Sequence, residues 1–227
     1  MIRFDVGLSD GRQARVRFSD LADGDFATSS SDPLLTTVRA RLSPYPWTWL
    51  RQVHGAGVVV VKHPGALAGS TADAAVTDVS NATLAVQTAD CVPVILVGID
   101  GIVGAAHAGW RGAVAGVLDA AVAAMRARVS GPVEAFVGPA IGPECYEFGA
   151  SDLDEVSSSL GAVVRSRTGT GQPALDLVSG VMRRLETLGV TATNVSKCTA
   201  CEGGWNSHRA RRDRGRQVGA VWIEAPE

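Results

Sequence analysis

The sequence predicts one α/β domain over residues 1–227, with a mixed sheet. Three observations support this fold class. Short β-branched runs alternate with segments of helical periodicity. The runs are almost continuously apolar, which is typical of strands covered on both faces. Two pairs of neighbouring runs are joined by connections too short for a helix, so part of the sheet is expected to be antiparallel.

The expected strands are apolar runs of five or six residues. The first reads GVVVVK, and its valines favour a buried strand. The full set is 57–62, 83–87, 92–97, 102–106, 133–138 and 218–223.

Helices are expected between these strands. Over residues 113–129 the apolar positions follow helical spacing, and residues 175–188 do the same before Gly189 ends the pattern. Ser151 is the expected cap of a shorter helix that begins at Asp152. Residues 28–33 form a polar loop or the start of a helix.

Composition narrows the function classes. The formal net charge of -2 argues against binding to nucleic acid or to anionic membranes, and 5% aromatic residues argue against a base-stacking platform. The start of the chain lacks the apolar stretch of a signal peptide, and the apolar segment 113–125 is too short to span a bilayer. We therefore expect a cytoplasmic protein whose four cysteines remain reduced and whose partners are small molecules. Its oligomeric state stays open.

Three segments place reactive side chains at the edges of expected strands. They read RQVHG (51–55), TADCVP (88–93) and AHAGWRG (106–112). Two imidazoles and a thiolate, from His54, His107 and Cys91, form a nitrogen and sulfur set that suits zinc, and three protein ligands leave a position open for catalysis. A lone histidine is more often a packing or surface residue, so spacing by itself does not settle this assignment.

Five motifs in order resemble one family. QVHG, TADCVPV, AHAGWRG, GPAIGPECYEFG (138–149) and the ending 198–216 are similar to the YfiH-type family, also called the laccase-domain or multicopper polyphenol oxidase family. The resemblance covers about residues 48–223. It implies a three-layer α/β/α fold related to cysteine hydrolases, and zinc bound by His54, Cys91 and His107. Copper is the alternative metal. Residues 17–25 depart from the family's glycine-containing start, which puts substrate preference in doubt.

Further residues carry two interpretations each. Asp90 is a general acid or base, or an anchor for the local backbone. Arg111, at the start of a helix, is an anion site or a surface ion pair. Cys91 is a candidate nucleophile as well as a ligand.

The remaining candidates lie in the matched motifs and near the end of the chain. Gln52, Arg209 and Arg216 lie in matched motifs and are the candidate substrate-binding residues, and His208 is a candidate for the pocket rim. Arg211, Arg212 and Arg214 are expected in a solvated loop. Cys198 and Cys201 have zinc or redox spacing but lack a second pair, so a structural role is expected.

The resemblance points to a zinc-dependent purine nucleoside phosphorylase that also acts as an adenosine deaminase and a methylthioadenosine phosphorylase. Arg111 would hold phosphate, and Asp90 would serve proton transfer. One alternative is a peptidoglycan-editing amidase acting on serine-containing muropeptides. A copper-dependent polyphenol oxidase is another, although four histidines are few for several coppers. A non-catalytic, metal-stabilised binding module is the last, and Cys145 as a fourth ligand would favour it.

Overall fold

The computed structural model describes residues 1–28, 33–195 and 197–225. The strands are β1 (Ile2–Gly7), β2 (Gln13–Phe18), β3 (Trp47–Arg51), β4 (Val58–Val60), β5 (Ser70–Thr71), β6 (Ala74–Thr77), β7 (Thr83–Thr88), β8 (Val92–Gly98), β9 (Ile102–Ala108), β10 (Val133–Val137), β11 (Arg165–Arg167), β12 (Pro173–Leu175), β13 (Thr191–Asn194) and β14 (Gln217–Glu224). The α-helices are α1 (Pro33–Leu42), α2 (Trp110–Val114), α3 (Val117–Arg126), α4 (Ala150–Leu160), α5 (Leu177–Thr187) and α6 (His208–Arg211). Short 3₁₀ helices occupy Leu21–Asp23, Pro143–Cys145 and Ala162–Val164.

Within the described residues, the strands form two six-stranded sheets and a two-stranded one. The first sheet has the order β1-β2-β14-β7-β3-β5, and the second has the order β13-β10-β8-β9-β6-β4. Both sheets are mixed, because β3 pairs parallel with β7 while β14 pairs antiparallel with it, and β13 pairs parallel with β10 while β8 pairs antiparallel with it. The predicted α/β class and the mixed pairing are confirmed.

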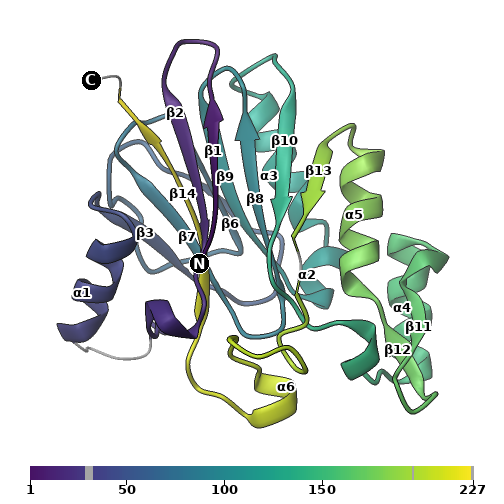
Figure 1. Ribbon diagram of the computed structural model, residues 1–227. Helices are drawn as coiled ribbons and strands as arrows, with labels where there is room; N and C mark the ends of the chain where they lie inside the picture. Colours follow the sequence, from purple (N-terminus) through teal and green to yellow (C-terminus); the bar gives the residue numbers. More distant parts are fainter. Residues whose placement is uncertain (29–32, 196, 226–227) are drawn as a thin grey trace.

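The two sheets pack face to face, with helices outside them (Figure 1). Alternate residues of β8 face opposite sides: Val94 and Leu96 join the core shared with α3 and α5, whereas Ile95 and Val97 join the core shared with the first sheet. Helix α1 packs against the outer face of the first sheet. The sequence predicts one sheet between helices, since a strand buried on both faces does not reveal whether a helix or a second sheet covers it.

The helices differ from the prediction at their ends. Residues 113–129 do not form one helix, because Gly116 adopts φ 89° and separates α2 from α3. The cap of α4 is Gly149 rather than Ser151. Helix α5 begins after Asp176, whose carboxylate accepts a hydrogen bond from the backbone N–H of Ser179. Of the polar segment 28–33, residues 29–32 lie outside the described part of the chain.

Strand pairing gathers the reactive segments at one place. β8 and β9 are antiparallel, so the start of β8 lies beside the end of β9, and Pro93 is paired with His107. Among the described residues, no helix combines the length and the apolar character that crossing a membrane requires.

A candidate metal and substrate site at the strand ends

Cys91 and His107 are positioned by the pairing of β8 with β9. Cys91 immediately precedes β8, and His107 lies near the end of β9. Gly109 follows on the same side of the site, where a Cβ atom would lie 2.5 Å from Cδ2 of His54 and 3.2 Å from Sγ of Cys91. A glycine is therefore required for the chain to turn into α2 beside the ligands.

His54 is held by a loop wrapped around one buried carboxylate. Asp73, fully buried between β5 and β6, accepts hydrogen bonds from the backbone N–H groups of Val53 (3.2 Å), His54 (3.0 Å) and Gly55 (2.8 Å). His54 adopts a left-handed conformation, with φ 59°. The three hydrogen bonds offset the cost of this conformation and fix the direction of its side chain.

The same carboxylate orients His107. Oδ1 of Asp73 lies 2.9 Å from Nδ1 of His107. Since a carboxylate accepts hydrogen bonds, Nδ1 carries the hydrogen and Nε2 is the nitrogen left for a ligand bond. A carboxylate on the distal nitrogen is the usual support of a metal-binding histidine.

The ligand atoms of His54, Cys91 and His107 all lie within 4.8 Å of one another. Sγ of Cys91 is 3.7 Å from Nε2 of His54. Two imidazoles and one thiolate at this separation fit a zinc or copper ion. The three residues predicted from separate motifs are thus brought together, and Cys145 belongs to a different group in the structure.

Electrostatics in this group favour an ionised thiol. Burial raises the pKa of Cys91, but the neighbouring His107 and His54 outweigh burial and bring it down to about 6. Burial lowers the pKa of His107, but Cys91 and Asp73 outweigh burial and raise it to about 9. The two shifts have opposite directions, so without a metal the pair favours a thiolate beside an imidazolium, and the thiolate is the form that binds metals or attacks electrophiles.

A cavity of about 370 Å³ opens onto the group. Its lining includes the three ligands together with Gln52, His208, Arg214 and Arg216. This volume lies within the range of small-molecule sites. Arg214 is exposed, as expected, and it also lines the cavity.

Two predicted substrate residues of the cavity also have structural contacts. Gln52 donates from Nε2 to the backbone O of Gln87 (2.7 Å) and accepts at Oε1 from its N–H (2.8 Å). Arg216 donates from Nη1 to three carbonyl oxygens of the turn 213–215, at distances of 2.7–3.1 Å. These contacts fix both side chains at the cavity wall.

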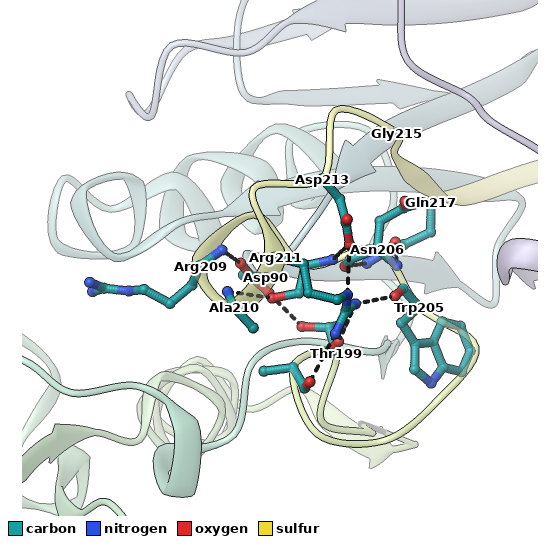
Figure 2. A network of polar contacts seen from close by, with 12 residues as sticks. Asp90, Thr199, Trp205, Asn206, Arg209, Ala210, Arg211, Asp213, Gly215 and Gln217 are labelled. Atoms are coloured by element: carbon teal, nitrogen blue, oxygen red, sulfur yellow. Dashed lines mark hydrogen bonds and ion pairs between the residues drawn. The ribbon is translucent and has the colours of Figure 1, made fainter.

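Asp90 connects the site to the end of the chain (Figure 2). Its Oδ1 accepts a hydrogen bond from the hydroxyl of Thr199 (2.7 Å), and its Oδ2 accepts one from the backbone N–H of Arg209 (2.6 Å). Both oxygens are engaged and the side chain is buried, which is the arrangement of an anchor. The catalytic role of Asp90 stays a prediction.

Arg111 and Arg209 lie at the two ends of a row of aromatic rings. The Arg111 guanidinium stacks 4.2 Å from the Trp110 ring centre, and the Arg209 guanidinium stacks 5.0 Å from that of Tyr146. Phe148 contacts both rings edge to face. Within the described residues, neither arginine is among those that line the cavity, so the phosphate role of Arg111 and the substrate role of Arg209 stay predictions.

Sequence reasoning missed two residues of this region. Asp73 lies in no recognised motif, and a buried carboxylate cannot be told from an exposed one by its neighbours in the chain. Arg211, expected to be solvated, donates to the carbonyl oxygens of Ala200 (2.9 Å), Thr199 (3.2 Å) and Trp205 (2.5 Å) (Figure 2). Arg211 therefore ties the segment before α6 together.

The fold and site define an α/β protein with a His–Cys–His group at the ends of antiparallel strands. Residues 27–224 match the sequence model of the multi-copper polyphenol oxidoreductase laccase family, and the chain belongs to this family.

Relatives in sequence carry names that mention phosphorolysis. The chain is 44% identical to a Streptomyces griseus protein named purine nucleoside phosphorylase ORF3, over 81% of this chain and 76% of that protein. It is 34% identical to a Deinococcus radiodurans protein named purine nucleoside phosphorylase, over 95% of this chain and 83% of that protein.

Solved structures share the fold. Neisseria meningitidis protein NMB0706 is similar with a TM-score of 0.81 and 27% identity, covering 99% of both chains. YlmD from Geobacillus stearothermophilus is similar with a TM-score of 0.76 and 28% identity, covering 95% of this chain and 93% of that one.

Proposed function

We propose that the protein is a zinc-dependent purine nucleoside phosphorylase that cleaves adenosine, inosine and methylthioadenosine. The observation that carries the proposal is a cavity of nucleoside size lined by the His–Cys–His group and by three arginines, Arg51, Arg214 and Arg216. The names of the relatives supply the reaction class. Deamination of adenosine is the second activity that we propose for the same site.

Different residues of the cavity would bind the phosphate and the nucleoside. Phosphorolysis joins a phosphate oxygen to the ribose carbon, breaks the bond to the purine and leaves the base to take up a proton. Arg214 and Arg216 would hold the phosphate dianion, and Gln52 has hydrogen-bonding capacity left for a polar edge of the substrate. Holding phosphate and nucleoside in line supplies much of the acceleration in such a reaction.

His54, Cys91 and His107 would hold the zinc ion. A metal at this place supplies a Lewis acid at neutral pH. Asp73 keeps the two histidines in their ligand geometry, and Asp90 keeps Cys91 in place through Thr199 and the backbone of Arg209. For Asp90 to pass a proton to the departing base, its carboxyl group would have to be protonated and give up one of the two hydrogen bonds that it accepts now.

The test follows base release from adenosine and inosine by chromatography, with and without phosphate. We expect free purine and ribose 1-phosphate when phosphate is present, and inosine as an additional product of adenosine. Equal base release without phosphate would identify a hydrolase and contradict the proposal. Cleavage of a serine-containing muropeptide without any base release would replace it with peptidoglycan editing.

Two arginine variants separate the candidate phosphate sites. Arg216→Ala is expected to raise the KM for phosphate about 10-fold or more, because the phosphate loses one charged hydrogen-bonding partner. The KM for the nucleoside is expected to change less. Arg111→Ala is the matched variant outside the cavity lining. If Arg111→Ala raises the KM for phosphate more than Arg216→Ala does, the phosphate site lies at the start of α2.

Copper-dependent oxidation of phenols is a second candidate, favoured by the family's description. The chain has four histidines, and two of them lie in the metal group, which suits one ion better than a cluster of several coppers. Oxygen uptake with a phenol, measured on copper-loaded protein, decides this candidate. Uptake that persists in Cys91→Ala would rule out this group as its source.

A further inference from the structure

A second group of metal-binding side chains lies outside the cavity. It consists of Glu144, Cys145, Cys198 and Cys201, whose ligand atoms all lie within 4.8 Å of one another. Glu144 and Cys145 belong to the 3₁₀ turn Pro143–Cys145, and the other two cysteines flank a two-residue turn. Two segments more than fifty positions apart in the chain thus present three thiols and a carboxylate to one point.

Backbone hydrogen bonds bring these segments together. Ala140 and Cys198 form a parallel bridge, in which the N–H of Ala140 donates to the carbonyl of Lys197 (3.1 Å) and the N–H of Thr199 donates to the carbonyl of Ala140 (3.0 Å). The turn is closed by a hydrogen bond from the N–H of Glu202 to the carbonyl of Cys198 (3.0 Å). The side chains are therefore gathered before any ion binds.

Polar contacts hold the turn that carries Cys198 and Cys201. The backbone N–H of Gly142 donates to Sγ of Cys198 at 3.2 Å. The Arg211 guanidinium donates to the carbonyl oxygens of Thr199 and Ala200, the two residues between Cys198 and Cys201. These contacts fix the positions of both thiols, and a metal ion that binds there would displace the thiol protons.

We propose that Glu144, Cys145, Cys198 and Cys201 bind a structural zinc ion. In a tetrahedral zinc site with bonds of about 2.3 Å to sulfur, the ligand atoms lie roughly 3.8 Å apart, so small side-chain shifts suffice to close the group. Three thiolates and one carboxylate fill all four positions, as structural zinc requires, whereas the group at the strand ends has three ligands. A disulfide would instead use two of the three thiols. The third thiol and the carboxylate would then have no shared metal ion to bind.

The site would act on the active centre through its neighbours. Thr199, within the turn, donates its hydroxyl to Asp90, and Asp90 immediately precedes Cys91. Tyr146, which follows Cys145, lies under the Arg209 guanidinium. A zinc ion that joins the two segments would thus fix the contacts of Asp90, next to Cys91, and of Tyr146.

Cobalt titration of the full chain tests the proposal. After removal of metals, wild-type protein is expected to bind two Co²⁺ per chain. The variant His54→Ala/Cys91→Ala is expected to bind one, with the strong near-ultraviolet sulfur-to-cobalt absorption of three thiolates. The matched variant Cys145→Ser/Cys201→Ser is expected to bind one with weaker absorption, because its remaining site has one thiolate.

The outcome does not depend on the cysteine-to-serine variant folding, since wild type and His54→Ala/Cys91→Ala keep the second group intact. Absence of three-thiolate absorption from both of these proteins would overturn the proposal. A thiol count on denatured protein purified without reductant completes the test. We expect four thiols, as the four cysteines require, and a count of two would show a disulfide in place of the zinc site.

Discussion

At the scale of single residues, Asp73 organises the candidate metal group more than any ligand does. It combines three backbone hydrogen bonds to the loop of His54 with one to Nδ1 of His107. Burial raises the pKa of Asp73, but the hydrogen bonds from His107 and from the backbone of Gly55 and Val53 outweigh burial and keep its pKa below the usual range. The carboxylate therefore stays ionised inside the protein, where it fixes two ligands at once.

Asp73→Asn is expected to weaken zinc binding about 10- to 100-fold, the usual effect of losing a carboxylate behind a metal-binding histidine. The amide nitrogen cannot accept the hydrogen bonds that one carboxylate oxygen accepts now. Competition with a chromophoric chelator measures the affinity. Asp78→Asn, at an exposed aspartate just after β6, is the matched control. Unchanged affinity in Asp73→Asn would contradict the positioning role.

Gly109→Ala tests how tightly the chain passes the ligands. A Cβ atom at this position would lie 2.5 Å from the His54 ring, so the ring must move. Crowding of this size costs about 1–3 kcal/mol, and we expect it as a roughly 10- to 100-fold loss of zinc affinity. Gly149→Ala is the control, because a Cβ there meets nothing within 4 Å. Equal zinc affinities of the two variants would show that the loop of His54 can move to make room for the added methyl group, and would contradict the prediction.

At the scale of elements, strands with a long apolar run were predictable and the others were not, so the edge strand β4 was found whereas the inner strand β6 was missed. β8 and β9 are apolar on both faces, so their runs stand out in the sequence. β1 alternates between half-buried and exposed residues at the edge of the first sheet, which leaves no apolar run to recognise. The break between α2 and α3 was missed because helical spacing of apolar residues continues through Gly116.

The residues of the candidate site also divide into those that the sequence reveals and those that only the folded structure reveals. His54, Cys91 and His107 were found because each lies in a recognisable motif beside a strand. Asp73 and the second cysteine group depend on which segments meet in space. Pairing of the segments around Ala140 and Cys198 is a tertiary contact that spacing along the chain does not reveal.

Three strands of the first sheet are joined by Arg15 in β2. Its guanidinium lies 2.9 Å from Asp5 in β1 and 2.7 Å from Glu224 in β14. The hydrogen bond from Arg15 lowers the pKa of Glu224, and its partial burial opposes this. Burial raises the pKa of Asp5, but Arg17 and Arg15 outweigh burial and lower it.

Arg15→Gln is expected to lower the free energy of unfolding at pH 7 by about 0.2–1 kcal/mol. A carboxylate with a lowered pKa stabilises the fold above its unfolded pKa of about 4, and this stabilisation is lost as the pH falls through the folded pKa. The difference between wild type and variant should therefore shrink below about pH 4. Urea unfolding at several pH values measures it, with Arg41→Gln on the exposed side of α1 as control. A difference that is constant with pH would contradict the ion pairs.

At the scale of the whole molecule, the cores and the metal groups are separate. One core lies between the two sheets, a second lies between the second sheet and α3 and α5, and a third lies under α1. Within the described residues, the side chains of both metal groups lie outside all three core clusters. Apolar burial in a chain of this size supports the fold without a bound ion.

Cys91→Ala is therefore expected to abolish turnover and keep the fold. The substitution removes one ligand at the start of β8 and leaves the pairing of β8 with β9 intact, so the cost should be about 1–3 kcal/mol of a total near 5–15 kcal/mol. Far-ultraviolet circular dichroism should match wild type, and thermal unfolding should remain one cooperative transition. The variant keeps the ligands of the second group intact, so it separates the two proposed ions, which chelation of the wild type would remove together. Cooperative unfolding of the sheets in Cys91→Ala at 25 °C would show that the ion at the strand ends holds the fold, and would turn the candidate catalytic group into a structural one.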